Sequence, residues 1–396
     1  MNVILFDDDS RGELLPLTYT RPTADLRVGV LTIREKWEKY LSTSSSSITE
    51  NYLSNKYPAI VADDNMLING SVFPNRELVD DILSMGSNEK LVHGNVTIAA
   101  RLDREKLNTV LSDSVLISKL DVIKRSCEFQ FDKLNHLWDL FQKNGSELEA
   151  DFKLLSKNRK SATISKTNQV IGNHIFIEEG AKVECAILNS NTGPIYIGKD
   201  TEVMEGSIVR GPFALCNHST LKLGTKIYGP TTIGPHSKVG GEVNNSVILG
   251  YSNKGHDGFM GNSIIGEWCN LGADTNTSNL KNNYGNVSVW NYPKRELVKT
   301  EHQFVGLIMA DHSKCGINTM FNTGTVVGVC SNVFGADFPS KFIPSFSWGG
   351  ANGFVDFKIE KAFELAESVM DRRGVKLTQE DREILKHIDT VSQNFK

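Results

Sequence analysis

The sequence predicts an α/β domain followed by a parallel β-helix and a short helical tail. Apolar strand-like runs alternate with helical patterns over residues 1–165, which is typical of an α/β domain. Over residues 166–350 an apolar side chain returns at every sixth position, which indicates a solenoid of short strands. Residues 351–396 carry two amphipathic patterns of helical period. The 396 residues suffice for two or three domains with cores of their own.

The first domain is expected to begin with a buried strand at Val3–Phe6, which an acidic turn follows. Expected helices cover 33–40, 75–85 and most of 133–156, and expected strands cover 59–65, 66–73 and 91–102. The serine run at 44–47 predicts an exposed loop.

The repeat of the second domain is carried by apolar residues spaced six apart. They are Ile171, Ile177, Val183, Ile197, Val203, Val209, Leu215, Leu221, Ile227, Ile233, Val239, Phe259, Ile265, Leu271, Met309, Cys315, Phe321, Val327 and Val333. Each unit gives one short strand and a corner, with the apolar side chain pointing inward and glycine often forming the bend. Three units would complete a coil, and neighbouring coils would hydrogen-bond about 4.8 Å apart.

One stretch of the repeats, residues 252–284, carries reactive groups. His256 stands there among glycines and small polar residues, and Asn270 and Asn279 follow it. A histidine can take a proton from an attacking amine near neutral pH. Asparagine side chains and backbone N–H groups can stabilise the resulting oxyanion. The alternative is that His256 is a polar wall residue without chemistry.

The repeats resemble the left-handed parallel β-helix of hexapeptide-repeat acyltransferases. The resemblance implies left-handed coils, although crossover connections are normally right-handed. It also implies a homotrimer with active sites between adjacent subunits. The excursion Asn279–Phe304 interrupts the repeat and is expected to reach a neighbour or a ligand, with a plain surface insertion as the alternative.

Residues 252–279 resemble the acetyltransferase half of the bifunctional N-acetylglucosamine-1-phosphate uridylyltransferase/glucosamine-1-phosphate acetyltransferase family. The resemblance implies that His256 is the general base and that acetyl-CoA and a sugar phosphate are substrates. It assigns substrate binding to Asn270, Asn279, Lys254 and Phe259, and acetyl-CoA binding to Ala273 and Lys281. The sequence departs from the family at Phe259, where the family has tyrosine, and at Leu280, where it again has tyrosine.

The first domain carries a second resemblance. The strings Leu15–Thr18, Thr20–Pro22 and Val28–Gly29 resemble the signature of sugar-1-phosphate nucleotidyltransferases. In that family a glycine-rich loop binds the nucleoside triphosphate, and an aspartate after a later strand holds Mg²⁺. In this chain Ser10, Arg11 and Arg21 are the residues that could contact the triphosphate, and Asp7 and Asp8 are those that could hold Mg²⁺. The departures are Asp7–Asp9 in place of glycines, Thr23 in place of a lysine, and Ser71 in place of a metal-binding aspartate.

Composition limits the class of protein. The net charge of −4 argues against a nucleic-acid-binding protein, which usually has a strongly basic face. Six cysteines without a C-x-x-C pair predict buried free thiols in a reducing compartment. No signal peptide is evident, and no apolar run approaches the roughly 20 residues of a membrane helix. A soluble cytoplasmic protein is therefore expected.

The tail is expected to form two helices without chemistry of their own. The first has one apolar face and should end before Gly374, and the second should begin at Thr378, which Asp381 helps to cap. The pair could cap the open end of the solenoid or cover a neighbouring subunit.

The leading hypothesis is a sugar-phosphate transferase in which the β-helix transfers an acetyl group and the first domain transfers a nucleotidyl group. Three alternatives stay open. The first domain could be the only active part, with the β-helix as a trimerisation scaffold, or the chain could be a binder that has lost both reactions. His302 and His312 leave open a zinc site of the kind found in other β-helix proteins.

Overall fold

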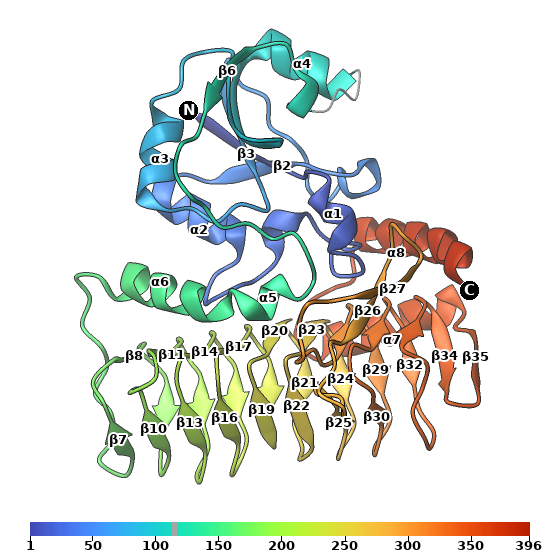
Figure 1. Cartoon of the computed structure of the whole chain (residues 1–396). Coiled ribbons are helices and arrows are strands. Elements are labelled where there is room, and N and C mark those ends of the chain that lie inside the picture. The colour runs from blue at the N-terminus through green and yellow to red at the C-terminus, as the bar shows by residue number, and fades with distance from the viewer. Residues whose placement is uncertain (113–116) are drawn as a thin grey trace. The chain divides into compact units, whose positions relative to one another are not determined.

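The computed structural model describes residues 1–112 and 117–396 (Figure 1). Contacts divide the chain into two compact units. The first contains Met1–Leu14, Thr20–Leu26 and Leu31–His136, and the second contains Leu15–Tyr19, Arg27–Val30 and Leu137–Lys396. Residues 137–165, which were expected in the first domain, therefore contact mainly the solenoid unit.

The first unit is built on a mixed six-stranded sheet in the order β2-β1-β3-β5-β4-β6. The strands are β1 (Asn2–Phe6), β2 (Ser45–Ile48), β3 (Asp64–Asn69), β4 (Glu89–His93), β5 (Val96–Asp103) and β6 (Ile123–Ser126). Its helices are α1 (Ser10–Glu13), α2 (Ile33–Leu41), α3 (Arg76–Leu83) and α4 (Arg104–Ser112), with short 3-10 turns at η1 (Thr23–Asp25), η2 (Asn51–Leu53) and η3 (Ile117–Lys119). The predicted α/β class is confirmed.

Two expectations for this unit were wrong. The serine run is not an exposed loop, because Ser45–Ile48 pairs in parallel with β1 and both Ser46 and Ser47 are buried. Residues 59–63 form no strand, and the strand expected there begins only at Asp64.

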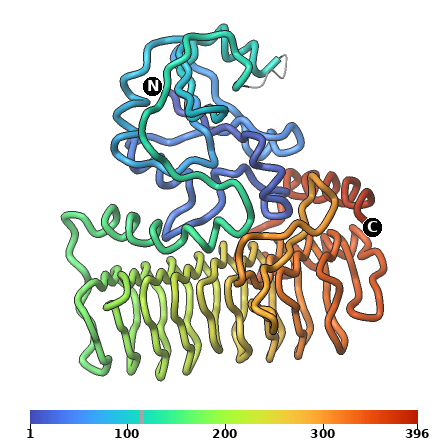
Figure 2. Tube along the Cα trace, viewed as in Figure 1, coloured from blue at the N-terminus to red at the C-terminus, as the bar shows by residue number. Residues whose placement is uncertain are grey.

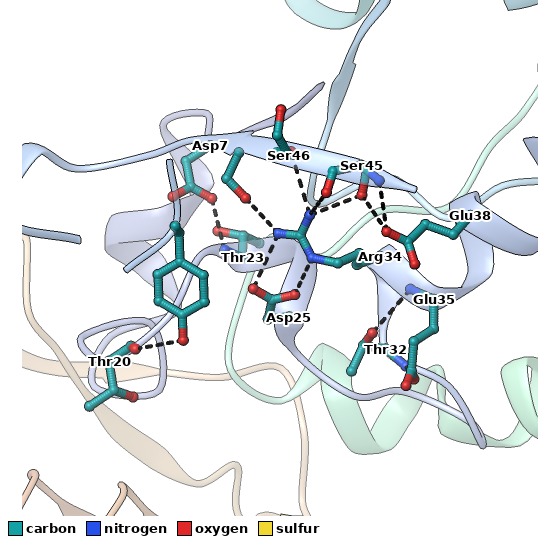
Figure 3. A network of polar contacts seen from close by, with 12 residues as sticks. Asp7, Thr20, Thr23, Asp25, Thr32, Arg34, Glu35, Glu38, Ser45 and Ser46 are labelled. Carbon is teal, nitrogen blue, oxygen red and sulfur yellow. Dashed lines mark hydrogen bonds and ion pairs between the residues drawn. The ribbon is translucent and has the colours of Figure 1, made fainter. Parts of the chain in front are cut away.

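The side chain of Arg34 explains why serines can form this edge strand. Its guanidinium donates to the Ser45 and Ser47 hydroxyls at 2.9 and 2.5 Å, and it forms a two-point ion pair with Asp25 (Figure 3). Glu38 accepts from the Ser45 backbone N–H and hydroxyl at 2.8 and 2.9 Å. Hydroxyls that would otherwise need water thus have partners within the protein.

The second unit is a parallel β-helix with three sheet faces, as predicted (Figure 2). Face 1 contains β7 (Gln169–Ile171), β10 (Ile187–Asn189), β13 (Ile208–Arg210), β16 (Lys226–Tyr228), β19 (Glu242–Asn244), β22 (Phe259–Gly261), β25 (Asn276–Thr277) and β30 (Met320–Phe321). Face 2 contains β8 (Ile175–Ile177), β11 (Ile195–Ile197), β14 (Phe213–Leu215), β17 (Thr231–Ile233), β20 (Val247–Gly250), β23 (Ile264–Glu267), β28 (Ile308–Met309), β31 (Val326–Val327) and β33 (Phe342–Ile343).

Face 3 is the longest and ends in a hairpin. It contains β9 (Lys182–Val183), β12 (Glu202–Val203), β15 (Thr220–Leu221), β18 (Lys238–Val239), β21 (Asn253–Lys254), β24 (Asn270–Leu271), β29 (Lys314–Cys315), β32 (Asn332–Val333), β34 (Ser347–Gly350) and β35 (Gly353–Asp356). Strands β34 and β35 are antiparallel, so β35 covers the outer edge of β34 and is the terminal strand of the face.

The six-residue register is confirmed for all but two of the predicted inward positions. Ile171 is 36% exposed, and Phe259 is only partly buried while its neighbour Met260 lies in the core. Phe259 is displaced because the coil after Val239 is shortened, which moves the inward positions to Val243, Ile248, Lys254 and Met260.

The corner between faces 2 and 3 has the same unusual backbone in successive coils. Its residues adopt left-handed φ angles of 53° to 60°, and they are Asp200, His218, His236, Tyr251, Trp268, His312, Cys330 and Phe346. The five aromatic rings from His218 to His312 stack on one another at centroid distances of 4.3 to 6.3 Å. Aromatic stacking thus joins the coils on their outer side.

The excursion folds back onto its own chain. Strands β26 (Ser288–Asn291) and β27 (Glu296–Lys299) form an antiparallel hairpin. Trp290 stacks on Phe342 at 4.0 Å, and Tyr292 is buried against Phe342 and Phe395. Part of the excursion is thus held against its own chain, and its contact with a neighbour or a ligand stays a prediction.

Helices α5 (Asp139–Gln142) and α6 (Asn144–Ser156) lie along face 2 (Figure 1). Between α6 and the face runs the segment Arg27–Val30. Its Gly29 backbone N–H donates to Asn144 at 2.7 Å, and the Gly29 carbonyl accepts from Thr232 at 2.9 Å. Gly29, which belongs to the nucleotidyltransferase-like signature, therefore joins α6 to face 2 of the solenoid through hydrogen bonds, a contact called the Gly29 clamp below.

The tail forms α7 (Ile359–Asp371) and α8 (Gln379–Ser392), followed by the turn η4 (Gln393–Phe395). Thr378 and Asp381 form the predicted capping box, and Gly374 has a φ of +68°. Five of the six cysteines are buried free thiols as predicted, whereas Cys185 is exposed. Among the residues that the structure describes, no helix has the length and apolar character needed to cross a membrane.

Candidate functional site

A cavity of about 720 Å³ lies on the outer side of face 3, and three of the predicted site residues line it. His256, Asn270 and Ala273 are among its walls, together with Tyr251 and Asn253. Asn253 and Asn270 are register partners on β21 and β24, so the strand pairing places their side chains on the same face. The cavity therefore joins the predicted base to one predicted substrate-binding amide.

His256 stands on the corner between faces 3 and 1, and its side chain is exposed. The corner needs glycine at 258, where φ is +118° and a Cβ would lie 2.2 Å from the Thr275 carbonyl oxygen. At Gly255, by contrast, a Cβ would have open space. The corner therefore requires glycine after the histidine, at position 258, but not before it, at position 255.

Lys254 does not bind substrate at the surface, and this expectation is corrected. It occupies an inward position between Val239 and Leu271 and is only 2% exposed. Its Nζ donates to the Gly240 and His256 carbonyl oxygens at 3.0 and 2.7 Å. Burial lowers the pKa of Lys254 to about 8. The lysine thus secures the backbone of the histidine corner from inside the coil.

Asn279, Phe259 and Lys281 lie outside this cavity. Asn279 follows face 1 and donates to Asn262 at 2.8 Å, and a Cβ on Gly261 would touch both the Asn279 amide and the Phe259 ring. Lys281 donates to the Asn286 carbonyl within the base of the excursion at 2.6 Å. Within one chain, the predicted site is therefore split between two places.

Sequence reasoning missed the contribution of the tail. Val369, Arg372 and Arg373 from the end of α7 line the cavity, and Arg373 donates to Asn253 at 3.1 Å. The tail, which was expected to carry no chemistry, thus contributes side chains to the cavity wall. The neighbouring arginines before Gly374 were the one available signal, and nothing local connects them to a strand 120 residues earlier.

The lysines of face 3 were also missed. Lys222, Lys238 and Lys314 line the same cavity. Each follows or precedes an inward apolar residue, so its side chain points outward by the alternation of a strand. Cys269 lines the cavity as well, but burial raises the pKa of its thiol and Sγ donates to the Ala310 carbonyl at 3.1 Å. A buried neutral thiol is a poor nucleophile.

In the first unit, Asp7 is held by internal partners. It accepts from the Thr23 backbone N–H at 2.8 Å, from the Thr49 hydroxyl at 2.5 Å and from Arg11 at 3.1 Å (Figure 3 shows the bond to Thr23). Arg11 is buried and also donates to the Arg21 carbonyl at 3.0 Å. Arg21 is buried too. Neither guanidinium is presented at the surface.

Asp8 is similarly engaged. Its carboxylate accepts from the Ser10 backbone N–H at 3.0 Å, from Asn69 at 2.8 Å and from Lys133 at 2.7 Å. Burial acts to raise the pKa of Asp8, but Lys133 and these hydrogen bonds outweigh it, so the pKa is lowered.

The two carboxylates that were predicted to hold Mg²⁺ are engaged by donors of the protein itself. All four oxygens of Asp7 and Asp8 already accept hydrogen bonds from the protein. Across residues 1–112 and 117–396, no group of three or more His, Cys, Asp or Glu side chains is placed to hold a metal ion. His302 and His312, which left a zinc site open, belong to no such group within these residues.

Comparison with known proteins supports the two resemblances. Residues 3–160 match a family described as sugar nucleotidyl transferase. The chain is 29% identical over 231 residues to the bifunctional protein GlmU of Methanococcus aeolicus and 32% identical over 230 residues to that of Methanocaldococcus jannaschii. Each of these matches covers 58% of this chain and 47% of the relative.

A further relative is the bifunctional sugar-1-phosphate nucleotidylyltransferase/acetyltransferase of Sulfurisphaera tokodaii. It is 26% identical over 169 residues, which cover 42% of this chain and 39% of the relative. The chain therefore spans about half the length or less of these relatives. The predicted resemblance to bifunctional transferases is confirmed.

Proposed function

We propose that the chain is a sugar-phosphate transferase whose solenoid transfers an acetyl group from acetyl-CoA to an amino-sugar phosphate. The observation that carries the proposal is that one cavity on face 3 contains His256, Asn270 and Ala273 together. Its volume of about 720 Å³ is in the range of small-molecule sites. The relationship to bifunctional nucleotidyl- and acetyltransferases supports the choice of reaction.

In this proposal His256 accepts a proton from the substrate amine as its nitrogen attacks the thioester carbonyl. The amide side chain of Asn270 and backbone N–H groups stabilise the oxyanion. The C–N bond forms, the C–S bond breaks, and the proton passes from the imidazolium to the departing thiolate. An amine and a thioester thus become an amide and free CoA, and no other reactant is required.

The split position of Asn279 and Phe259 is accounted for by a homotrimer. In that assembly, these residues on face 1 would serve the cavity of a neighbouring subunit. Two exposed apolar side chains support an interface beside the histidine corner. Leu223 and Ile317, 67% and 70% exposed, lie on the corner between faces 3 and 1, where His256 also stands.

Nucleotidyl transfer in the first domain is the second candidate. The match of residues 3–160 to sugar nucleotidyl transferases favours it. The buried ion pairs of Asp7, Asp8 and Arg11 weigh against an open triphosphate site. Release of pyrophosphate from a nucleoside triphosphate and a sugar 1-phosphate would support this activity, and ligand binding without turnover would favour an inactive binder instead.

The test of acetyl transfer follows free thiol release from acetyl-CoA with a panel of amino-sugar 1-phosphates. The variant His256→Ala should lower kcat at least about 100-fold, because a positioned general base contributes that much. His174→Ala is the matched control, since His174 is an exposed histidine on an early coil. Transfer at the full rate without His256 would refute its role. If no thiol is released with any acceptor, nucleotidyl transfer by the first domain or ligand binding without catalysis would be favoured instead.

A further inference from the structure

The cavity on face 3 is lined by five cationic side chains and by no carboxylate. The cations are Lys222, Lys238 and Lys314 from the solenoid and Arg372 and Arg373 from the end of α7. The chain as a whole carries a net charge of −4, so this concentration of positive charge is a local feature. Concave surfaces of one charge sign attract ligands of the opposite sign.

Two of the five cations have contacts that fix them within the wall. Lys314 donates to the His312 carbonyl at 2.8 Å, and Arg373 donates to the neutral amide of Asn253 at 3.1 Å. Neither partner is an anion. Among the described residues, no salt bridge joins any of the five to an Asp or Glu side chain.

The pKa of Lys238 reflects the other cations of the cavity. Burial lowers its pKa, and Arg373, Lys222 and Arg372 lower it further. Glu202 opposes this effect, but it is the weakest of the influences. Burial and then Arg372 also lower the pKa of Arg373. A bound anion would relieve this mutual repulsion, whereas a neutral ligand would not.

We propose that Lys222, Lys238, Arg372 and Arg373 bind a phosphate group of a substrate, so that the tail helix α7 is part of the substrate site. The inference rests on the proposed function, because it takes the ligand to be a phosphorylated substrate of the same cavity. Lys254, the lysine that was expected to bind substrate, is enclosed in the solenoid core and cannot contact a phosphate in the cavity. Arginine pairs and lysines suit a phosphate dianion because they supply several charged donors.

Two substrates could bring this phosphate, namely a sugar 1-phosphate and CoA with its 3′-phosphate. Isothermal titration of the full chain distinguishes them. One arm compares glucosamine 1-phosphate with glucosamine, and the other compares CoA with dephospho-CoA. The double variant Arg372→Gln/Arg373→Gln and the single variant Lys238→Gln should each lower the affinity for the phosphorylated ligand by about 30-fold or more. The affinity for the matching ligand without the phosphate should stay unchanged.

Three controls make the result specific. Lys376→Gln removes an exposed charge from the same tail without touching the cavity and should leave the affinity unchanged. His256→Ala should retain phosphate-dependent binding while it loses acetyl transfer. Circular dichroism establishes that α7 is intact in each variant.

The outcomes separate this inference from the proposed function. If binding depends on the phosphate and on the two arginines but no acetyl transfer occurs, the inference holds and the proposed reaction is refuted. Equal affinity of the wild type and the double variant for both phosphorylated ligands overturns the inference. The inference is also overturned if the wild type binds glucosamine 1-phosphate no more tightly than glucosamine and CoA no more tightly than dephospho-CoA.

Discussion

At the scale of single residues, Lys254 is the most unusual feature of the chain. An ammonium group inside a solenoid core is disfavoured by desolvation, and here it has two backbone carbonyls as partners but no carboxylate hydrogen-bonded to it. One of these carbonyls belongs to His256. The buried ammonium group of Lys254 therefore helps to fix the backbone position of His256, the proposed base.

This burial predicts a pH-dependent stability. The pKa of Lys254 falls from 10.5 in the unfolded chain to about 8 in the folded protein. Between these values the unfolded chain holds one proton more, so the free energy of unfolding should rise with pH by up to about 3 kcal/mol. Below pH 8 both states are protonated, and the contribution is flat. Denaturation of wild type and Lys254→Met at pH 7, 8, 9 and 10 should reveal this difference in slope.

Lys226→Met is the matched control for this experiment, because the Lys226 side chain is 60% exposed. Its stability profile should run parallel to that of the wild type. If Lys254→Met also runs parallel, the lysine keeps an ordinary pKa in the folded state and the prediction fails.

At the scale of elements, the edge strand β2 depends on one side chain from a neighbouring helix. Arg34 of α2 spans Asp25 and the serines of β2, and its side chain is 17% exposed. A serine-rich strand has little apolar area to bury, so its position depends on these polar contacts. The position of β2 beside β1 is therefore expected to depend on Arg34.

Arg34→Ala should destabilise the first unit by about 2–3 kcal/mol, because it leaves the Asp25 carboxylate without its ion pair and removes bonds to two serines. Hydrogen exchange should accelerate at Ser45–Ile48 more than at β3. Arg104→Ala is the control, since Arg104 and Asp63 are 54% and 93% exposed and such surface pairs contribute about 0–1 kcal/mol. Unchanged exchange at β2 would mean that backbone pairing alone holds the strand.

At the scale of the whole molecule, the solenoid offers surfaces that a single chain leaves uncovered. Besides Leu223 and Ile317, the outward side chains of Ile208, Tyr228 and Met320 on face 1 are exposed. A corner with exposed apolar residues on both sides of His256 is the arrangement expected for an interface that completes a site. The homotrimer of the proposal would bury this corner.

Sedimentation velocity tests this assembly. The wild type should sediment with three times the mass of one chain, and Leu223→Asp/Ile317→Asp should dissociate it, because carboxylates would be buried without partners. Val355→Asp is the control, because Val355 is 67% exposed on the terminal hairpin and not on this corner. A monomeric wild type, or a double variant that stays trimeric, would contradict the proposed interface.

The sequence alone determined the solenoid, because its code is local. Each coil repeats the same choice of inward apolar residue and corner, so residues six apart predict the core without knowledge of distant contacts. The same holds for the capped helix at Thr378. Where the spacing changed after Val239, the local rule misplaced Phe259 and did not show that Lys254 points inward.

Only the tertiary structure decided which side chains share a site. The Ser45–Ile48 strand depends on Arg34, the Gly29 clamp depends on Asn144, and the basic cavity depends on Arg373 reaching Asn253. These contacts join residues from about 10 to more than 100 positions apart, and neither periodicity nor local propensity encodes them. The energy of a hydrogen bond or a charge depends on which groups the folded chain brings within a few ångströms, and that is decided only when the elements pack.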